Sequence, residues 1–330
     1  MPMLQALLPP LLAYSGGYRQ GLSNHVPMAL QALAELGADE AELRRRAASC
    51  AHLEALVDDG RDIADIGGWL GDPSSEAAWR RRFAWERESE CWQRCWPQRL
   101  QLVLEAPASA SFHGVIRLAY AVRGGMGAEV DAALAYALAN WRLLPSPGRS
   151  AVPLILPELL REWHRAPIPP GEEGRLIADD IEHALAASVL PWRLPPGLLA
   201  GAREQRRLCR LLFLARRQFN TLHLLTAWEA SLSLARGQGW SEVPDCAVLQ
   251  MQMALLGAFI YHGCPALPTL RRDPLPPLAD IRRLARAQRD DHSVKLALSC
   301  MRLAELDGDA AWLELATEVA VHGWPERVAA

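Results

Sequence analysis

The sequence lacks the features that a membrane-spanning or nucleic-acid-binding protein needs. It has no run of 18 apolar residues uninterrupted by charge or proline, so it predicts no membrane-spanning helix. Residues 1–17 are apolar, but the segment is short, has no basic start and is interrupted by Pro9 and Pro10. It therefore predicts a core-packing segment and not a signal peptide. Because the net charge is only −3, we expect neither a nucleic-acid partner nor a membrane partner.

The chain also lacks the cysteine spacing of a structural zinc site. Its seven cysteines, none in a CxxC pair, are Cys50, Cys91, Cys95, Cys209, Cys246, Cys264 and Cys300. Cys91 and Cys95 lie one helical turn apart, but no second pair exists to complete a tetrahedral site. The odd number favours reduced thiols, as expected in the cytoplasm.

Lysine is almost absent from the sequence. Of 35 basic side chains, 34 are arginine and one, Lys295, is lysine. Arginine serves wherever only a positive charge is needed, but its guanidinium group does not lose its proton in proteins. The single lysine is therefore a candidate for chemistry that arginine cannot do.

Strand signals are missing as well, whereas helical signals run through the chain. No segment alternates apolar and polar residues over a useful length, and no repeat of fixed period is present. The apolar periodicity and the stop signals predict helices at 25–37, 38–52, 76–106, 111–122, 128–141, 154–164, 174–189, 198–213, 216–235, 243–261, 276–288, 290–306 and 308–321. Within these, Pro97 predicts a break or kink. The predicted fold is all-α, one large domain of about 12 or more helices over residues 1–330.

Nine histidines are present, and four of them stand in or beside strongly apolar helices. These are His25, His113, His223 and His292. Four imidazoles with one oxygen donor would suit a divalent first-row metal such as iron. No two of them form an HxxxH or HExxH motif, so their spacing does not show that they meet. The alternative for each is an ordinary hydrogen-bonded histidine of the core or surface.

His292 and Lys295 share one face of a predicted helix, because residues three apart differ by about 60° around the axis. The apolar residues 296–298 that follow predict that this face packs inward. Burial lowers the pKa of an amine, so the neutral form of the lysine becomes accessible. A neutral amine can react with carbon dioxide to give a carbamate, which turns a cation into an oxygen ligand.

Four segments, in this order, resemble the questin oxidase-like family, whose characterised members act in fungal aromatic polyketide pathways. They are NHVPMALQALAELGA (24–38), FHGVIRLAYAV (112–122), LHLLTAWEASL (222–232) and DDHSVKLALSC (290–300). The resemblance implies a mostly helical fold and a non-haem iron site. The implied ligands, which are also the implied catalytic residues, are His25, His113, His223, His292 and carbamylated Lys295.

The resemblance further implies a mono- or dioxygenase that acts on a small aromatic, anthraquinone-type substrate. Its reaction would be oxidative ring cleavage or Baeyer–Villiger-like oxygenation. The implied cofactors are Fe(II/III) and the carbon dioxide that forms the carbamate, with dioxygen as co-substrate and NADPH as a candidate electron donor. The chain departs from the fungal members at residues 27–29, where they tend to carry further histidines, and it is shorter. His262, in FIYHGCPAL, is the reserve ligand.

Several acidic and aromatic residues near the four histidines are candidates for supporting roles. Asp290, Asp291 and Glu229 are predicted either to orient imidazoles or to act as helix caps and surface charges. The aromatic candidates for a planar-substrate pocket, with the core as their alternative place, are Trp228, Tyr120 and Trp141.

Three other functions fit the sequence less directly. An NADPH-dependent oxygenase without a bound metal lacks the expected motif, because no GxGxxG follows a strand and GGMG at 124–127 joins two predicted helices. A non-catalytic helical ligand-binding protein needs only structural histidines. A haem protein would use one helical histidine as an axial ligand.

Overall fold

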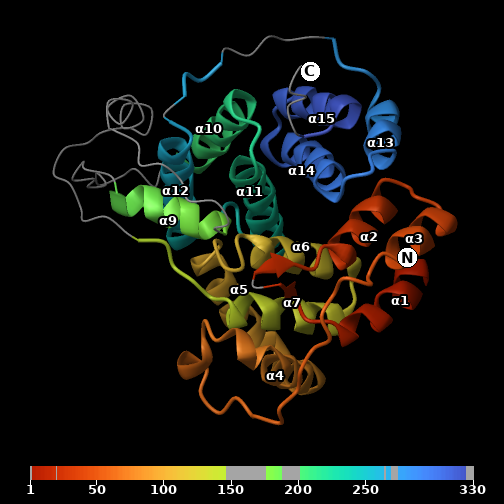
Figure 1. The fold of residues 1–330 in the computed structure, drawn as a ribbon, viewed down its shortest axis with the longest axis vertical. Helices are drawn as coiled ribbons and strands as arrows, with labels where there is room; N and C mark the ends of the chain where they lie inside the picture. Colours follow the sequence, from red (N-terminus) through yellow and green to blue (C-terminus); the bar gives the residue numbers. More distant parts are fainter. Residues whose placement is uncertain are drawn as a thin grey trace.

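Helices make up nearly all of the regular structure in the computed structural model, which describes residues 2–19, 21–145, 176–187, 201–263, 265–268 and 274–324. The described residues form fourteen α-helices, three short 3-10 helices and one two-stranded hairpin, so the all-α prediction is confirmed (Figure 1). The α-helices are α1 (Pro2–Leu7), α2 (Val26–Glu35), α3 (Glu40–Ala47), α4 (Glu76–Glu88), α5 (Trp92–Glu105), α6 (His113–Gly124), α7 (Gly127–Ala139), α9 (Ile177–Ala187), α10 (Ala202–Ala215), α11 (Phe219–Gly237), α12 (Asp245–Tyr261), α13 (Leu278–Arg286), α14 (Asp291–Asp307) and α15 (Ala311–His322). The 3-10 helices are η1 (Pro9–Ala13), η2 (Gly67–Trp69) and η3 (Pro73–Ser75), and the strands are β1 (Gly17–Tyr18) and β2 (Leu22–Ser23). The helix predicted at 154–164 lies outside the described residues.

Some helix boundaries follow local sequence signals. Helix α3 begins at a capping box, in which the Asp39 side chain accepts from the Glu42 backbone N–H and the Glu42 side chain accepts from that of Asp39. Helix α6 stops at Gly125, which has φ of +67° and supports the turn predicted at 124–127. The break predicted at Pro97 is wrong, because α5 continues through this residue and the chain breaks before Trp92 instead. Pro97 removes one hydrogen bond, to a carbonyl in the exposed first turn that water can satisfy.

Four helices form a closed ring at the centre of the molecule. Around this ring α2 contacts α6, α6 contacts α11, α11 contacts α14, and α14 contacts α2. Helix α11 lies in the middle of Figure 1, where it also contacts α10 and α12. Helix α7 covers α6 and is itself covered by α4, whereas α15 covers α14. One continuous apolar core, from Leu4 to Ala320, joins these layers.

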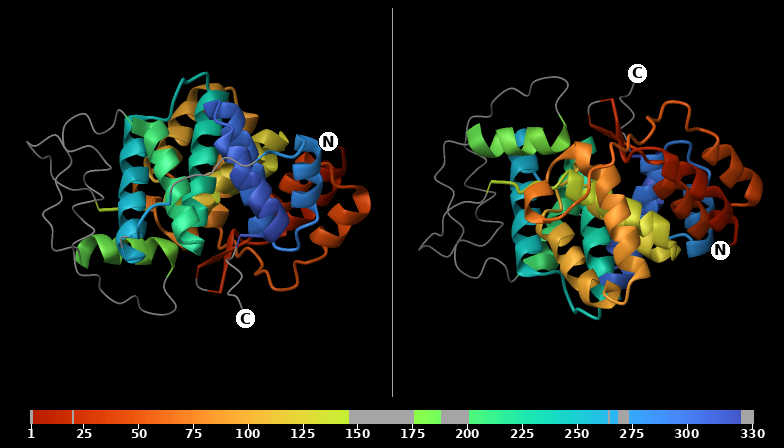
Figure 2. Two further views of the ribbon diagram at one scale, coloured as in Figure 1. Left: turned by 90° about the horizontal axis from the view of Figure 1, so that it is seen from above. Right: turned by 90° about the horizontal axis from the view of Figure 1, so that it is seen from below.

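The first and last parts of the chain lie side by side (Figure 2). Arg286 Nη1 on α13 donates to the carbonyl of Gly37 at 2.6 Å, and Arg46 on α3 pairs with Asp291 on α14. In the opening segment Leu4, Leu8 and Leu11 are buried, so the predicted core packing of residues 1–17 is confirmed for this part. Among the helices that the structure describes, none combines the length and the apolar character that crossing a membrane requires.

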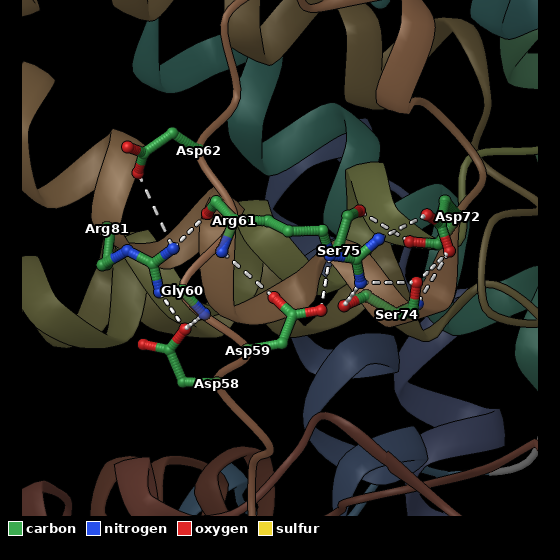
Figure 3. A network of polar contacts seen from close by, with 9 residues as sticks. All are labelled: Asp58, Asp59, Gly60, Arg61, Asp62, Asp72, Ser74, Ser75 and Arg81. Carbon is green, nitrogen blue, oxygen red and sulfur yellow. Dashed lines mark hydrogen bonds and ion pairs between the residues drawn. The ribbon is translucent and has the colours of Figure 1, made fainter.

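The connection from α3 to α4 has little regular structure and is held by ion pairs (Figure 3). Arg81 on α4 pairs with Asp58, and Arg61 pairs with Asp59 and donates to the carbonyl and hydroxyl of Ser74. These side chains are partly exposed, so each pair contributes little alone, about 0–1 kcal/mol. Together they hold this connection against α4.

Candidate metal centre

Each helix of the central ring carries one of the four predicted histidines at its N-terminal end. His25 is the N-cap residue of α2, and His113 is the first residue of α6. His223 is the fifth residue of α11, and His292 is the second of α14. One nitrogen from each ring lies within 4.8 Å of the others. The four helices therefore direct their N-termini at one point, although their histidines are spread over most of the chain.

The imidazole of His113 stands between two others. Its Nε2 lies 2.8 Å from Nε2 of His25 and 3.0 Å from Nε2 of His223. On the far side of each ring, Nδ1 of His113 lies 2.9 Å from the carbonyl of Ala110, and Nδ1 of His223 lies 2.6 Å from that of Phe219. A carbonyl oxygen only accepts, so both Nδ1 atoms carry the proton. The Nε2 lone pairs of His113 and His223 therefore face each other, and a cation between them would remove this repulsion.

Two of the nitrogen separations fit ligands at right angles around one metal ion of more than four ligands. At a metal–nitrogen distance of about 2.1 Å, ligands at right angles stand about 3.0 Å apart, and tetrahedral ligands about 3.4 Å. The two measured separations, 2.8 and 3.0 Å, match the right-angled arrangement. Nε2 of His292 is buried and has no hydrogen-bond partner among the described residues, so it is free to be a further ligand.

Burial keeps the four imidazoles neutral, which is the form that binds metals. Desolvation is the largest cause of the lowered pKa at all four, and it brings the pKa of His113 to about 3. The charge of Lys295 is a further cause at each of the four histidines. Lys295 is therefore close enough to the cluster to act on it electrostatically.

Lys295 is itself 3% exposed, as the predicted inward face requires. Desolvation lowers the pKa of its amine to about 8, although the charges of Asp291 and Asp290 oppose this. Within the described parts of the chain no carboxylate forms an ion pair with it, since Asp291 pairs with Arg46 on α3. With a pKa of about 8, roughly one tenth of the amine is neutral at pH 7, far more than for a lysine with the ordinary pKa of about 10.4.

The three acidic residues predicted to orient imidazoles differ in what they contact. Asp290 is both a cap and a ring contact, because it accepts from the backbone N–H of Ser293 at 2.8 Å and lies 3.3 Å from Nδ1 of His292. Asp291 lies beside Lys295 but is paired with Arg46. Glu229 belongs to a separate buried ion cluster, and its described partners include no histidine.

A strained turn directly before His113 was not predicted. Ala110, Ser111 and Phe112 all have positive φ, of 51°, 53° and 74°. L-residues pay roughly 1–2 kcal/mol each for this left-handed conformation. The turn brings the Ala110 carbonyl under Nδ1 of His113, which sets the direction of the ring. None of the three residues is glycine, so no residue type in this segment indicates a left-handed turn.

A pocket of about 320 Å³ opens beside the cluster. It is lined by Tyr18, Gly21, Leu22, Ser23, His25, Ser111, His113, Leu176, Ile177, Phe219 and His292. Phe219 is 40% exposed, and its ring centroid lies 4.8 Å from that of His223 and 4.5 Å from that of His292. The position of Phe219, four residues before His223 on one helical face, was a signal that could have found it. Tyr18 lies in the hairpin β1–β2, where the sequence shows no alternation of apolar and polar residues that would predict strands.

The predicted aromatic lining is wrong. Tyr120 and Trp228 are fully buried in the core, and Trp141 donates its indole N–H to the carbonyl of Leu102 at 3.0 Å. None of the three residues lines the pocket beside the cluster. The reserve ligand His262 also lies outside the cluster, with Nε2 2.5 Å from Oδ1 of Asn220.

The cysteines take no part in this centre. The six that the structure describes are free thiols, as predicted, and none belongs to the histidine cluster. In comparisons with known proteins, the chain matches no family model and none of the curated sequences.

Proposed function

We propose that the protein is a non-haem iron-dependent oxygenase of the kind that its resemblance to the questin oxidase-like family implies. The observation that supports this is the convergence of four neutral imidazoles beside a mostly apolar pocket. His25, His113, His223 and His292 would hold the iron through nitrogen. The bound iron would supply the electrons and dioxygen chemistry that side chains lack.

Lys295 would complete the site as a carbamate. Its neutral Nζ forms a bond to the carbon of carbon dioxide, and one N–H proton leaves to solvent, so an anionic oxygen donor replaces an ammonium group. The lowered pKa of Lys295, about 8, favours the neutral amine that this reaction needs. Arginine cannot make this group, which gives a reason for a lysine at this position in a chain that otherwise uses arginine.

The pocket favours a small uncharged substrate, in agreement with an aromatic or polyketide-like molecule. Apart from the histidines, its described lining has no ionisable acid or base except the phenol of Tyr18. The hydroxyls of Tyr18, Ser23 and Ser111 are the groups that could bind a substrate oxygen. The exposed ring of Phe219 offers a flat surface next to two of the proposed ligands.

Metal analysis tests the proposal most directly. Protein purified under aerobic and anaerobic conditions should hold about one iron per chain. The variant H113Q should lose it, and H262Q, which alters a histidine outside the cluster, should keep it. Sub-stoichiometric iron in both preparations would favour a metal-free NADPH-dependent oxygenase or a ligand-binding protein. A Soret band would indicate haem instead.

The carbamate has its own test. Lys295→Arg keeps the charge but cannot react with carbon dioxide, so it should lower iron content and dioxygen consumption with anthraquinone substrates, with and without NADPH. Carbon-13-labelled carbon dioxide should give a carbamate resonance in the wild type that the variant lacks. If iron content and activity both survive in Lys295→Arg, the carbamate is wrong.

A further inference from the structure

The four ring helices carry a second layer of polar residues, set at the same distance from each histidine. Ten residues after its histidine each helix has a polar side chain of one network. These are Glu35 on α2, Arg123 on α6, Ser233 on α11 and Arg302 on α14. Ten residues advance about 15 Å along a helix. Because the four helices start together and the spacing is equal, the polar layer lies parallel to the histidine layer.

Glu229 connects the members of this layer. It is 1% exposed, and it accepts from Arg123 Nη1 at 2.9 Å and from the Ser233 hydroxyl at 2.6 Å. Its second oxygen lies 3.5 Å from Arg302 Nη1. Glu35 pairs with Arg302 and lies 3.7 Å from Arg123 Nε. All four helices of the ring are thus tied to one buried carboxylate or to its arginine partners.

Two more residues of the ring join the same layer. Ser299 on α14 donates to Glu229 Oε2 at 3.3 Å. The ring of Tyr120 on α6 lies between the two guanidinium groups, with Arg123 Cζ 4.7 Å and Arg302 Cζ 5.2 Å from its centroid. The layer is therefore a largely buried, charged network carried by the ring helices. Its hydrogen bonds are not all made, because the Tyr120 hydroxyl and Nε and Nη2 of Arg123 have no hydrogen-bond partner among the described residues.

Such a network specifies how the helices are aligned along their axes. Apolar contacts between helices tolerate small shifts, whereas buried charges are costly unless their partners meet. A shift of one helix by a single residue moves it by about 1.5 Å. That shift would break both the ion cluster and the 2.8 and 3.0 Å approaches of the Nε2 atoms.

We propose that Glu229, with Arg123, Arg302 and Glu35, fixes the axial alignment of the ring and so sets the geometry of the metal centre from roughly 9 to 15 Å away along the helices. These are positioning residues, since none of them contacts a histidine of the cluster. The inference rests on the proposed metal site but not on the reaction that the site performs.

Cobalt(II) titration of the full-length, metal-free protein tests this inference, because the visible absorption of cobalt(II) reports both affinity and coordination. Glu229→Gln should weaken cobalt(II) binding by up to about tenfold, because loss of a residue that contacts a metal ligand directly costs about 10–100-fold and Glu229 acts from further away, and it should change the spectrum. Glu35→Gln removes the partly exposed carboxylate of the same network. Glu35→Gln should give a smaller change in cobalt(II) affinity in the same direction. It replaces Glu229→Gln as the test if that variant does not fold.

Glu129→Gln is the matched control. Glu129 and Arg117 form an ion pair at 2.8 Å, each 1% exposed, that joins α6 to α7 outside the ring. Its loss should lower the melting temperature but leave the cobalt(II) affinity and spectrum unchanged. Folded Glu229→Gln and Glu35→Gln variants with wild-type affinity and spectrum would overturn the alignment role alone. A wild-type protein that binds no cobalt(II) or iron(II) would overturn the metal centre as well.

Discussion

The metal-free protein should lose stability in mild acid, because it buries neutral histidines that the unfolded chain protonates. His113 shows the effect most clearly, since it is 4% exposed and burial lowers its pKa from 6.5 to about 3. A group whose pKa is lowered by folding contributes stability above its unfolded pKa and loses it as the pH falls. The loss should therefore begin near pH 6.5 and continue down to about pH 3.

The size of the loss at pH 5 follows from these values. Between pH 6.5 and 5 the unfolded chain takes up the proton at His113 and the folded protein does not. This interval of 1.5 units, at about 1.36 kcal/mol per unit, gives about 2 kcal/mol from His113 alone. His25 and His223 change in the same direction for the same reason, so they add to it. For a protein whose total stability is about 5–15 kcal/mol, this is a large fraction.

Urea denaturation of chelator-treated protein at pH 7.5 and pH 5 measures this loss. His113→Gln should reduce the difference in unfolding free energy between the two pH values by about 2 kcal/mol. His52→Gln, which alters an exposed histidine of the connection between α3 and α4, is the matched control. If His113→Gln retains the full wild-type difference, then the buried neutral imidazole of His113 is not a cause of the lower stability at pH 5, and the reasoning is wrong.

Two further predictions concern the metal and the pocket. Iron(II) or cobalt(II) at 100 times its dissociation constant should raise the unfolding free energy by about 2.7 kcal/mol, measured by denaturation with and without metal, whereas His113→Gln should show no such rise. Gly21→Ala should destabilise the protein by at least about 1 kcal/mol and reshape the pocket, because Gly21 has φ of +124° and a Cβ there would lie 2.7 Å from Leu176 Cδ2. Gly37→Ala, with φ of +86° but open space around it, separates the backbone strain from the clash.

The helices could be predicted from the sequence because their signals are local. Apolar periodicity, the acidic start of α3 and the glycine after α6 all act within a few residues. The shared inward face of His292 and Lys295 was predictable for the same reason, and both side chains are buried. What no local signal could provide was the meeting of His25 with His113, His223 and His292. Only the family resemblance led to that expectation.

Buried charges were the least predictable part of the fold. Runs such as Arg80–Arg82 and Arg206–Arg207 look like solvent-facing helix surfaces in the sequence. In the structure, Arg206 is 2% exposed and pairs with Asp307 and Glu242, and Arg80 is half-buried beside Glu76. The acidic partners of these arginines are distant along the chain or one helical turn away. Composition alone therefore does not distinguish the buried arginines from exposed ones.

The arrangement of the ring also bears on why the proposed centre needs an anionic ligand. Four helix N-termini meet there, each equivalent to about half a positive charge, so the protein already presents about two positive charges to the site. A divalent cation held by four neutral imidazoles adds two more, and a protonated Lys295 would add another. The nearest carboxylates offset this only in part, because Asp291 is paired with Arg46 and the Asp290 side chain is 47% exposed. Conversion of Lys295 to a carbamate would replace a positive charge with a negative one beside the four imidazoles, where the excess of positive charge is greatest.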